Sequence, residues 1–234
     1  MHPLKFRLRG TDYSRYVLNG FLSAYFTNPN IHTPNAEAER DLWKDWYVMY
    51  IPYMRGLAYF LKIDDMLAKA ARDKHVDTRR PLDIIISELA VRRLQGQILQ
   101  AQDWLDLLYP YLGKERVDKD FEDMSSGKKV VDLSETEIFG RVGKLVEVRQ
   151  EIMDFGFERS SLDSRIITGL KKGSRAEFAG LQEGDKIVWN SRAWYSNFEN
   201  NMKLIVERDG KKICVEYWPR SFKLAPSWQL VSES

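Results

Sequence analysis

The stretch 41–61, DLWKDWYVMYIPYMRGLAYFL, carries seven aromatic side chains within 21 residues. Aromatic residues recur there at intervals of three and four, which predicts a helix with a broad apolar stripe. Pro52 lies inside the stretch. Because proline has no amide hydrogen and crowds the preceding turn, we expect the helix to kink or restart there. A kink would turn Tyr50, Tyr53 and Arg55 toward one place, so the stripe predicts either a core helix or the wall of a binding site.

The composition is that of a folded, globular protein. The chain has 234 residues, of which 44% are hydrophobic and 30% charged, enough for one or two domains with a sizeable core. Its 36 basic and 34 acidic residues are interspersed, and the net charge of +2 points to neither nucleic acid nor a membrane surface as a partner. The single cysteine, Cys214, excludes an intrachain disulfide and fits a reducing compartment. We find no run typical of a signal peptide or a membrane span and expect a cytoplasmic protein.

The first part of the chain, residues 1–125, is predicted to be an all-helical domain. Residues 12–28 have an apolar helical face. The aromatic stretch belongs to a long helix that continues to about residue 72. Pro81 suits the first turn of the next helix, and residues 103–112 form a further short helix.

From residue 126 onward the hydrophobic pattern changes from helical to strand-like. We expect a linker over 126–145, a small β-rich domain over 146–222 and a tail over 223–234. Short strands are predicted at 165–169, 185–189, 202–208 and 211–218. Asp209-Gly210 separates the last two and predicts a two-residue hairpin, because a type I′ turn needs positive φ. The predicted fold class is α+β, with a helical domain followed by a small β-barrel or sandwich.

Two segments of the second domain carry a resemblance to a known fold. Residues 173–188, GSRAEFAGLQEGDKIV, resemble the signature of a PDZ domain, and Asp154-Phe155-Gly156-Phe157 resembles the loop whose amides receive a peptide's terminal carboxylate in that family. PDZ domains hold a peptide as an added strand beside a helix. Only the 12 residues NSRAWYSNFENN stand where that helix belongs. This segment is too short for the usual helix, which favours a PDZ-like packing block and disfavours a peptide ligand.

Two segments of the helical domain carry a second resemblance. Residues 19–26 read NGFLSAYF, and residues 52–56 read PYMRG. With the PDZ-like part behind them, they resemble the C-terminal half of the glycyl aminopeptidase family of zinc peptidases. The first segment is similar to the one that supplies the family's third zinc ligand, a glutamate, and Asn19 stands at that position. The second is similar to a Tyr-x-Lys-Gly segment of related aminopeptidases, which implies that the hydroxyl of Tyr53 stabilises an oxyanion.

The zinc site of that family is not expected here. Zinc catalysis needs three protein ligands and a bound water. The three histidines, His2, His32 and His75, are neither followed by glutamate nor four residues apart, and position 19 holds an amide. The adjacent Asp64 and Asp65 are interpreted as a solvated helix face rather than as cation ligands. We therefore expect no zinc peptidase activity, no metal and no cofactor.

The first functional hypothesis, which we favour, is a metal-independent enzyme that has kept the peptidase-like pocket. It would act on a hydrophobic small molecule as a cyclase, isomerase or dehydratase, of the kind found in secondary metabolism. Orientation, hydrogen bonds to a carbonyl and proton transfer would supply the catalysis. The predicted catalytic residues are Tyr53, Asn19 and Arg55, and the predicted substrate-binding residues are Tyr25, Trp43, Trp46 and Tyr50.

The second hypothesis is a non-catalytic pseudo-peptidase that binds partners through its PDZ-like domain. The absent metal site supports it, and the shortened peptide groove weakens it. A helical part without the neighbouring domain of the family would expose a formerly buried face, and self-association as a homodimer is one way of covering that face. An enclosed cavity shared by Tyr53 and Asn19 would favour the enzyme.

Overall fold

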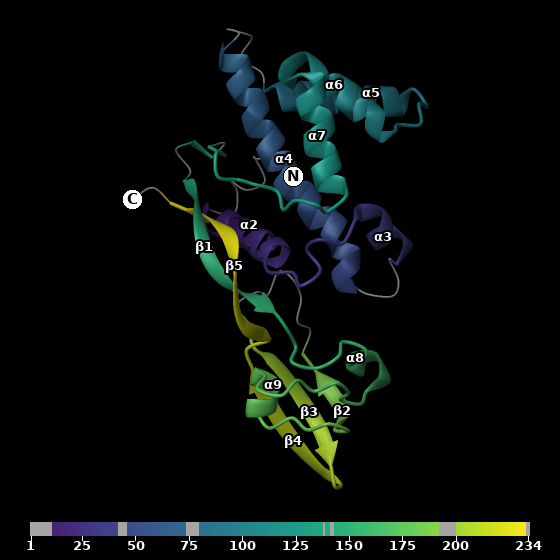
Figure 1. Cartoon of the computed structure of the whole chain (residues 1–234), viewed down its shortest axis with the longest axis vertical. Coiled ribbons are helices and arrows are strands. Elements are labelled where there is room, and N and C mark those ends of the chain that lie inside the picture. The colour runs from purple at the N-terminus through teal and green to yellow at the C-terminus, as the bar shows by residue number, and fades with distance from the viewer. Residues whose placement is uncertain are drawn as a thin grey trace. The chain divides into compact units, whose positions relative to one another are not determined.

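The computed structural model describes residues 11–41, 46–73, 80–137, 139–140, 143–191 and 200–232 (Figure 1). The chain divides into two compact units. The strand unit comprises Met1–Pro29 and Glu147–Gln229, and the helical unit comprises Asn30–Val146 and Leu230–Ser234.

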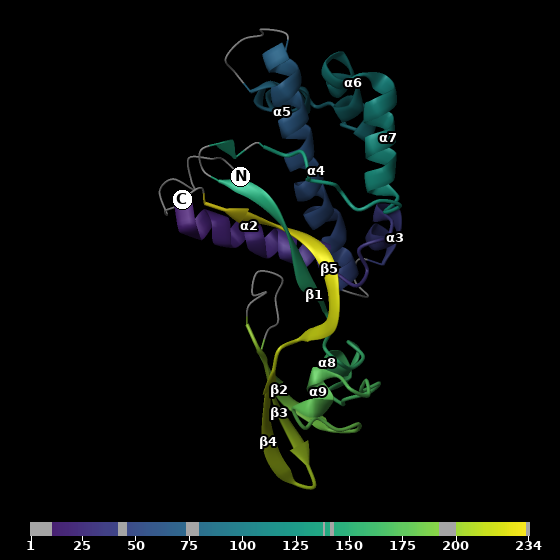
Figure 2. The same ribbon diagram turned by 60° about the vertical axis from the view of Figure 1, so that its left-hand side comes forward.

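Helix α2 (Thr11–Phe26) belongs to the strand unit, although the sequence predicts it in the helical domain. The amide of Met153 donates to the carbonyl of Thr27, just beyond the helix, over 2.9 Å. Arg220 donates to Thr27 Oγ1 over 3.0 Å. Both views show α2 running beside strands β1 (Lys144–Met153) and β5 (Arg220–Val231) (Figures 1 and 2). The two units therefore do not follow the boundary predicted at residue 125.

The helical unit is organised around α4 (Trp46–Asp73), which spans 28 residues. It contacts α3 (Asn35–Arg40), α5 (Pro81–Leu94), α6 (Ala101–Leu112) and α7 (Lys114–Ser125). Its core-facing apolar side chains recur about once per turn, as in an amphipathic helix. They are Ile51, Met54, Ala58, Ile63 and Leu67, all buried.

Pro52 does not divide α4, which runs without a break through that position. Of the predicted kink or restart, the restart does not occur. Pro52 lies in the second turn, where the lack of its amide hydrogen removes a single hydrogen bond. Packing along the rest of the helix outweighs that loss.

The segment that follows α7 lies against α4 and does not behave as a free linker. Val131 and Leu133 are buried. The amide of Glu137 donates to Asp65 Oδ1 over 2.9 Å, and Lys69 Nζ donates to the carbonyl of Glu135. These contacts make residues 131–137 a second wall opposite part of α4.

In the strand unit, β2 (Lys186–Asn190), β3 (Met202–Arg208) and β4 (Lys211–Tyr217) form an antiparallel sheet in the order β2-β3-β4. Arg208 pairs with Lys211 across the turn, and Asp209 and Gly210 have φ values of 49° and 71°. The predicted Asp-Gly hairpin is thus confirmed.

Strands β1 and β5 form a separate two-stranded sheet. Residues 220–231 are therefore a strand over most of the predicted tail. The two short helices of the strand unit are α8 (Ser161–Ser164) and α9 (Arg175–Phe178).

The fold class is mixed α+β, with helices mostly in the N-terminal part and strands in the C-terminal part, as predicted. In the part of the chain that the structure describes, the strands form two open sheets and no closed barrel. Within the same residues, no helix combines the length and the apolar character needed to cross a membrane.

Candidate functional site

The first half of α4 brings Tyr50 and Tyr53 together without enclosing them. Their ring centroids lie 6.3 Å apart. Tyr53 is 70% exposed, which leaves it on the surface rather than in a cavity. An exposed hydroxyl is poorly placed to stabilise an oxyanion, because water screens the developing charge. Further along the helix, Tyr59 belongs to the core, and burial raises the pKa of Tyr59 to about 12.

Arg55 is fully buried and holds the loop that precedes α3. Its Nη1 donates to Asn35 Oδ1 over 2.7 Å, and its Nη2 donates to the carbonyls of Ile31 and Thr33 over 2.6 and 2.8 Å. Gly127 packs closely on the same group, since a side-chain carbon there would lie 3.1 Å from Arg55 Nη2. Both terminal nitrogens are therefore engaged in fixing this loop, whereas Nε is buried without a hydrogen-bond partner among the described residues. Because the whole side chain is buried, the structure does not support the catalytic role predicted for Arg55.

The other predicted site residues are divided between the two units or lie outside the described residues. Asn19 and Tyr25 are on α2 of the strand unit, where Asn19 is half-buried and Tyr25 is buried with its ring edge-on to Phe26 at 4.8 Å. Trp43 lies outside the described residues, as does the side chain of Trp46 at the start of α4. Of the predicted set, the structure brings together Tyr50 and Tyr53.

In the loop that resembles the carboxylate-binding loop of PDZ domains, the side chain of Asp154 accepts hydrogen bonds from its own protein. The amide of Gly156 donates to Asp154 Oδ1 over 2.9 Å, and Lys171 Nζ donates to the same oxygen over 2.7 Å. The rings of Phe155 and Phe157 are buried and stacked. The carboxylate of Asp154 therefore accepts hydrogen bonds from one loop amide and from Lys171. Residues 192–199, most of the segment that replaces the groove helix, lie outside the described residues.

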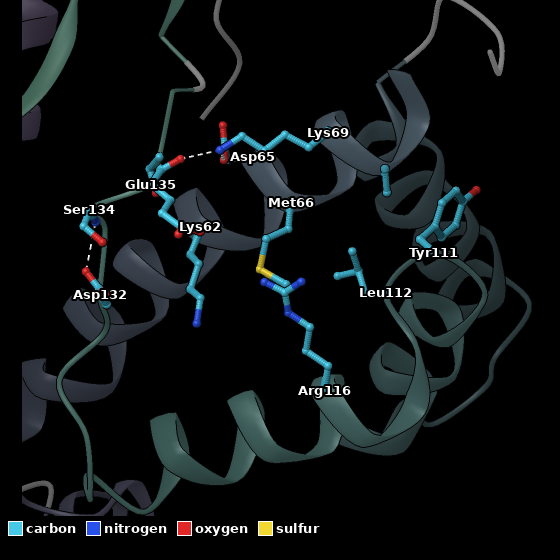
Figure 3. A pocket seen from close by; sticks show the side chains of 12 residues that line it. Lys62, Asp65, Met66, Lys69, Tyr111, Leu112, Arg116, Asp132, Ser134 and Glu135 are labelled. Carbon is cyan, nitrogen blue, oxygen red and sulfur yellow. Dashed lines mark hydrogen bonds and ion pairs between the residues drawn. The ribbon is translucent and has the colours of Figure 1, made fainter. Parts of the chain in front are cut away.

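A pocket opens on the second half of α4, inside the helical unit, with a volume of about 450 Å³ (Figure 3). We call it the α4 pocket. Its walls come from α4, from the end of α6, from the start of α7 and from the segment after α7. The lining residues are Lys62, Asp65, Met66, Lys69, Ala70, Tyr111, Leu112, Arg116, Asp132, Ser134, Glu135 and Thr136.

The α4 wall of this pocket is built from ion pairs. Asp65 Oδ2 lies 2.8 Å from Lys69 Nζ, one turn further along the helix. Asp64 and Asp65 are both buried, and Asp64 pairs with Arg80. The prediction of a solvated acidic face is therefore wrong. Each carboxylate is buried because a cation or a backbone amide accompanies it, which offsets the loss of hydration.

The opposite walls carry charges that face open space. Arg116 extends from α7 toward Met66 on α4 (Figure 3). Asp132 and Glu135 lie on the segment after α7, and Asp132 Oδ1 accepts the amide hydrogen of Ser134 over 2.9 Å. Among the described residues, the structure gives Arg116, Asp132 and Glu135 no ion pair. These three groups are therefore available to a bound molecule.

Sequence reasoning missed this pocket, although one signal for it was present. Lys62, Asp65, Met66 and Lys69 follow the i, i+3, i+4, i+7 spacing of a single helix face. This face is polar, so it gives no apolar stripe. Its partners, residues 111–116 and 132–136, are distant in sequence.

No three His, Cys, Asp or Glu side chains lie close enough to hold a metal ion in the portion of the chain described here. A scan against models of known protein families finds no match, and a search of curated proteins finds none either.

Proposed function

We propose that this chain binds a small zwitterionic molecule with an apolar part, such as an amino acid with an aliphatic side chain, in the α4 pocket. The observation that carries the proposal is the placement of Arg116 on one wall and of Asp132 and Glu135 on another, with none of the three in an ion pair among the described residues. A ligand carboxylate would receive charge-assisted hydrogen bonds from Arg116, and a ligand ammonium group would donate to Asp132 or Glu135. The apolar part would contact Met66 and Leu112.

The charge balance of the lining favours a zwitterion over a simple anion or cation. Three cationic and three anionic side chains line the pocket, so it carries no net formal charge. Lys69 is paired with Asp65, and Lys62 lies 3.1 Å from Asp120. The remaining groups are Arg116, Asp132 and Glu135, so a zwitterion can form an ion pair at both of its ends, whereas a simple anion or cation can use only one kind of group. The volume of about 450 Å³ lies within the range of small-molecule sites.

The metal-independent enzyme remains a proposal, and it now attaches to this pocket. Tyr111 and the Lys69–Asp65 pair are on the pocket wall and can exchange a proton with a bound molecule. An isomerase- or dehydratase-type conversion would therefore use these groups. The resemblance to glycyl aminopeptidases concerns residues 19–26 and 52–56, which do not line this pocket.

The proposal is tested by isothermal titration calorimetry with three probes that share the leucine side chain and differ in their charged groups. Leucine carries both charges, N-acetyl-leucine only the negative one, and leucinamide only the positive one. We expect saturable binding of leucine and at least about tenfold weaker binding of the other two, because each loses one charged hydrogen bond. Equal binding of all three probes, or no binding of leucine, would overturn the proposal.

Substitutions of pocket residues test whether leucine binds in the α4 pocket. Arg116→Gln and Glu135→Gln should each weaken leucine binding about tenfold or more. Arg40→Gln is the matched control, because Arg40 is an exposed arginine of the same unit that does not line the pocket. Product formation during the titration, followed by mass spectrometry, separates an enzyme from a binding protein.

The alternative of a non-catalytic interaction protein is favoured by one different observation. Helix α5 presents apolar side chains to solvent. This feature does not involve the α4 pocket.

A further inference from the structure

Helix α5 is apolar on its exposed side as well as on its buried one. Ile85 packs inward, whereas Ile84, Ile86 and Val91 are exposed and Leu94 is 87% exposed. Exposed apolar side chains that occur singly need no explanation, but a group of them on one helix marks an interaction surface.

The arrangement of these side chains suits a second helix. With 100° between successive residues, Ser87, Ala90 and Leu94 lie opposite the buried Ile85. The exposed apolar side chains Ile84 and Val91 flank this line on one side. Small residues at the centre allow another helix to approach closely, and larger apolar residues at the flanks then pack around it.

The charges on α5 indicate which helix that is. Asp83 lies at the start of α5 and Arg93 near its end, and among the described residues neither forms an ion pair. Glu88 and Arg92, by contrast, already form a pair at 2.8 Å. An antiparallel partner with the same sequence would place its own Arg93 beside Asp83.

We propose that α5 is the interface of a homodimer in which the α5 helices of two copies pack antiparallel about a two-fold axis. With the axis between Ser87 and Ala90, Ser87 faces Ala90 of the partner subunit. Ile84 then lies on the same flank as Val91 of the partner subunit, and Asp83 lies at the same end of the interface as Arg93 of the partner subunit. The two-fold axis forms each contact twice, so the surface is complementary to itself. A parallel arrangement would instead place equal charges against each other.

The dimer is weak because the surface is small. A helix of 14 residues is about 21 Å long. One such helix pair buries less area than a stable protein–protein interface of typical size. We therefore expect a dissociation constant on the order of micromolar.

Sedimentation equilibrium of the full chain over a concentration series tests the interface. Leu94→Ser should weaken the dimer at least tenfold. Phe178→Ser is the matched control, since Phe178 is a strongly exposed apolar residue of the strand unit. Circular dichroism of each variant verifies that it is folded.

A charge-reversal cycle tests the antiparallel register. Asp83→Arg and Arg93→Asp should each weaken the dimer, because each places like charges together twice. The double variant should restore the wild-type dissociation constant. A monomer at every concentration, a dimer insensitive to Leu94→Ser, or a double variant that fails to recover would overturn the proposal.

Discussion

The two halves of α4 use charged side chains in opposite ways. In the first half, Arg55 is buried and its two terminal nitrogens donate to the preceding loop and to Asn35. In the second half, Lys62, Asp65 and Lys69 line a pocket whose opposite wall carries Arg116 without an ion pair among the described residues. A buried group that hydrogen-bonds to a loop of its own protein fixes structure, whereas a charge that faces a cavity without a partner is available to a ligand. The candidate site therefore lies on the charged half of the helix and not on its aromatic half.

The largest expected effect on stability comes from removing the hydrogen bonds that Arg55 donates. Arg55→Leu should destabilise the protein by about 3 to 5 kcal/mol, because it leaves the part-buried carbonyls of Ile31 and Thr33 without their donor. Urea denaturation measures the change in the free energy of unfolding. A decrease in the free energy of unfolding of less than about 1 kcal/mol would show that these hydrogen bonds do not hold the loop.

A second substitution tests the close packing of Gly127 beside Arg55. Gly127 has a φ of +68°, and a side-chain carbon there would lie 2.4 Å from the carbonyl oxygen of His32. Gly127→Ala should therefore cost about 2 kcal/mol, from backbone strain and from the contact together. Gly173→Ala is the matched control, because Gly173 has a similar φ of +73° and nothing within 4 Å of the added carbon. Equal losses would mean that strain alone is responsible.

A third test concerns a buried carboxylate of the strand unit that accepts hydrogen bonds from its own protein. Asp185 is buried, and Arg208 donates to both of its oxygens over 2.7 Å. Burial alone would raise the pKa of Asp185, but the hydrogen bonds from Arg208 and from the amide of Gln182 bring it below the usual value. A depressed native pKa stabilises the fold above the unfolded-state pKa of the carboxyl, and this stabilisation is lost as pH falls through the native pKa.

Asp185→Asn should therefore lower the free energy of unfolding by about 1 to 2 kcal/mol at neutral pH. The difference from wild type should shrink as the pH falls through the native pKa of Asp185. Denaturation at a series of pH values measures this difference. A difference that stays constant with pH would contradict the assignment.

The parts of this fold that could be predicted are those determined by nearby residues. Asp209-Gly210 specifies its hairpin, because the turn needs positive φ at adjacent positions. Pro81 marks the start of α5 by the same kind of local rule. The role of Arg55 could not be read from the sequence, since its partners are carbonyls of a loop that any residue types could supply.

The candidate site depends on contacts between distant segments. Arg116 and Glu135 meet α4 only through the packing of α7 and of the segment that follows it. The aromatic stripe was a stronger local pattern, but such a pattern reports packing as readily as function. Tyr59, buried in the core, and Tyr53, on the surface, belong to the same stripe.

The smallest expected effect is at Tyr53, the residue that the sequence favours as catalytic. Tyr53→Phe should change the free energy of unfolding by less than about 0.5 kcal/mol, as is usual for an exposed side chain. It should also leave leucine binding unchanged. A loss of binding or of turnover in this variant would return the site to the first half of α4.

The most direct test of the site assignment is an amide ¹H–¹⁵N NMR spectrum of the full chain recorded during a titration with leucine. The account predicts that the largest chemical-shift changes occur at the amide signals of pocket residues such as Arg116, Ser134 and Thr136. The amide signals of residues 50, 51 and 53–56 should not shift. Shifts concentrated at residues 50–56, or none at millimolar leucine, would contradict it.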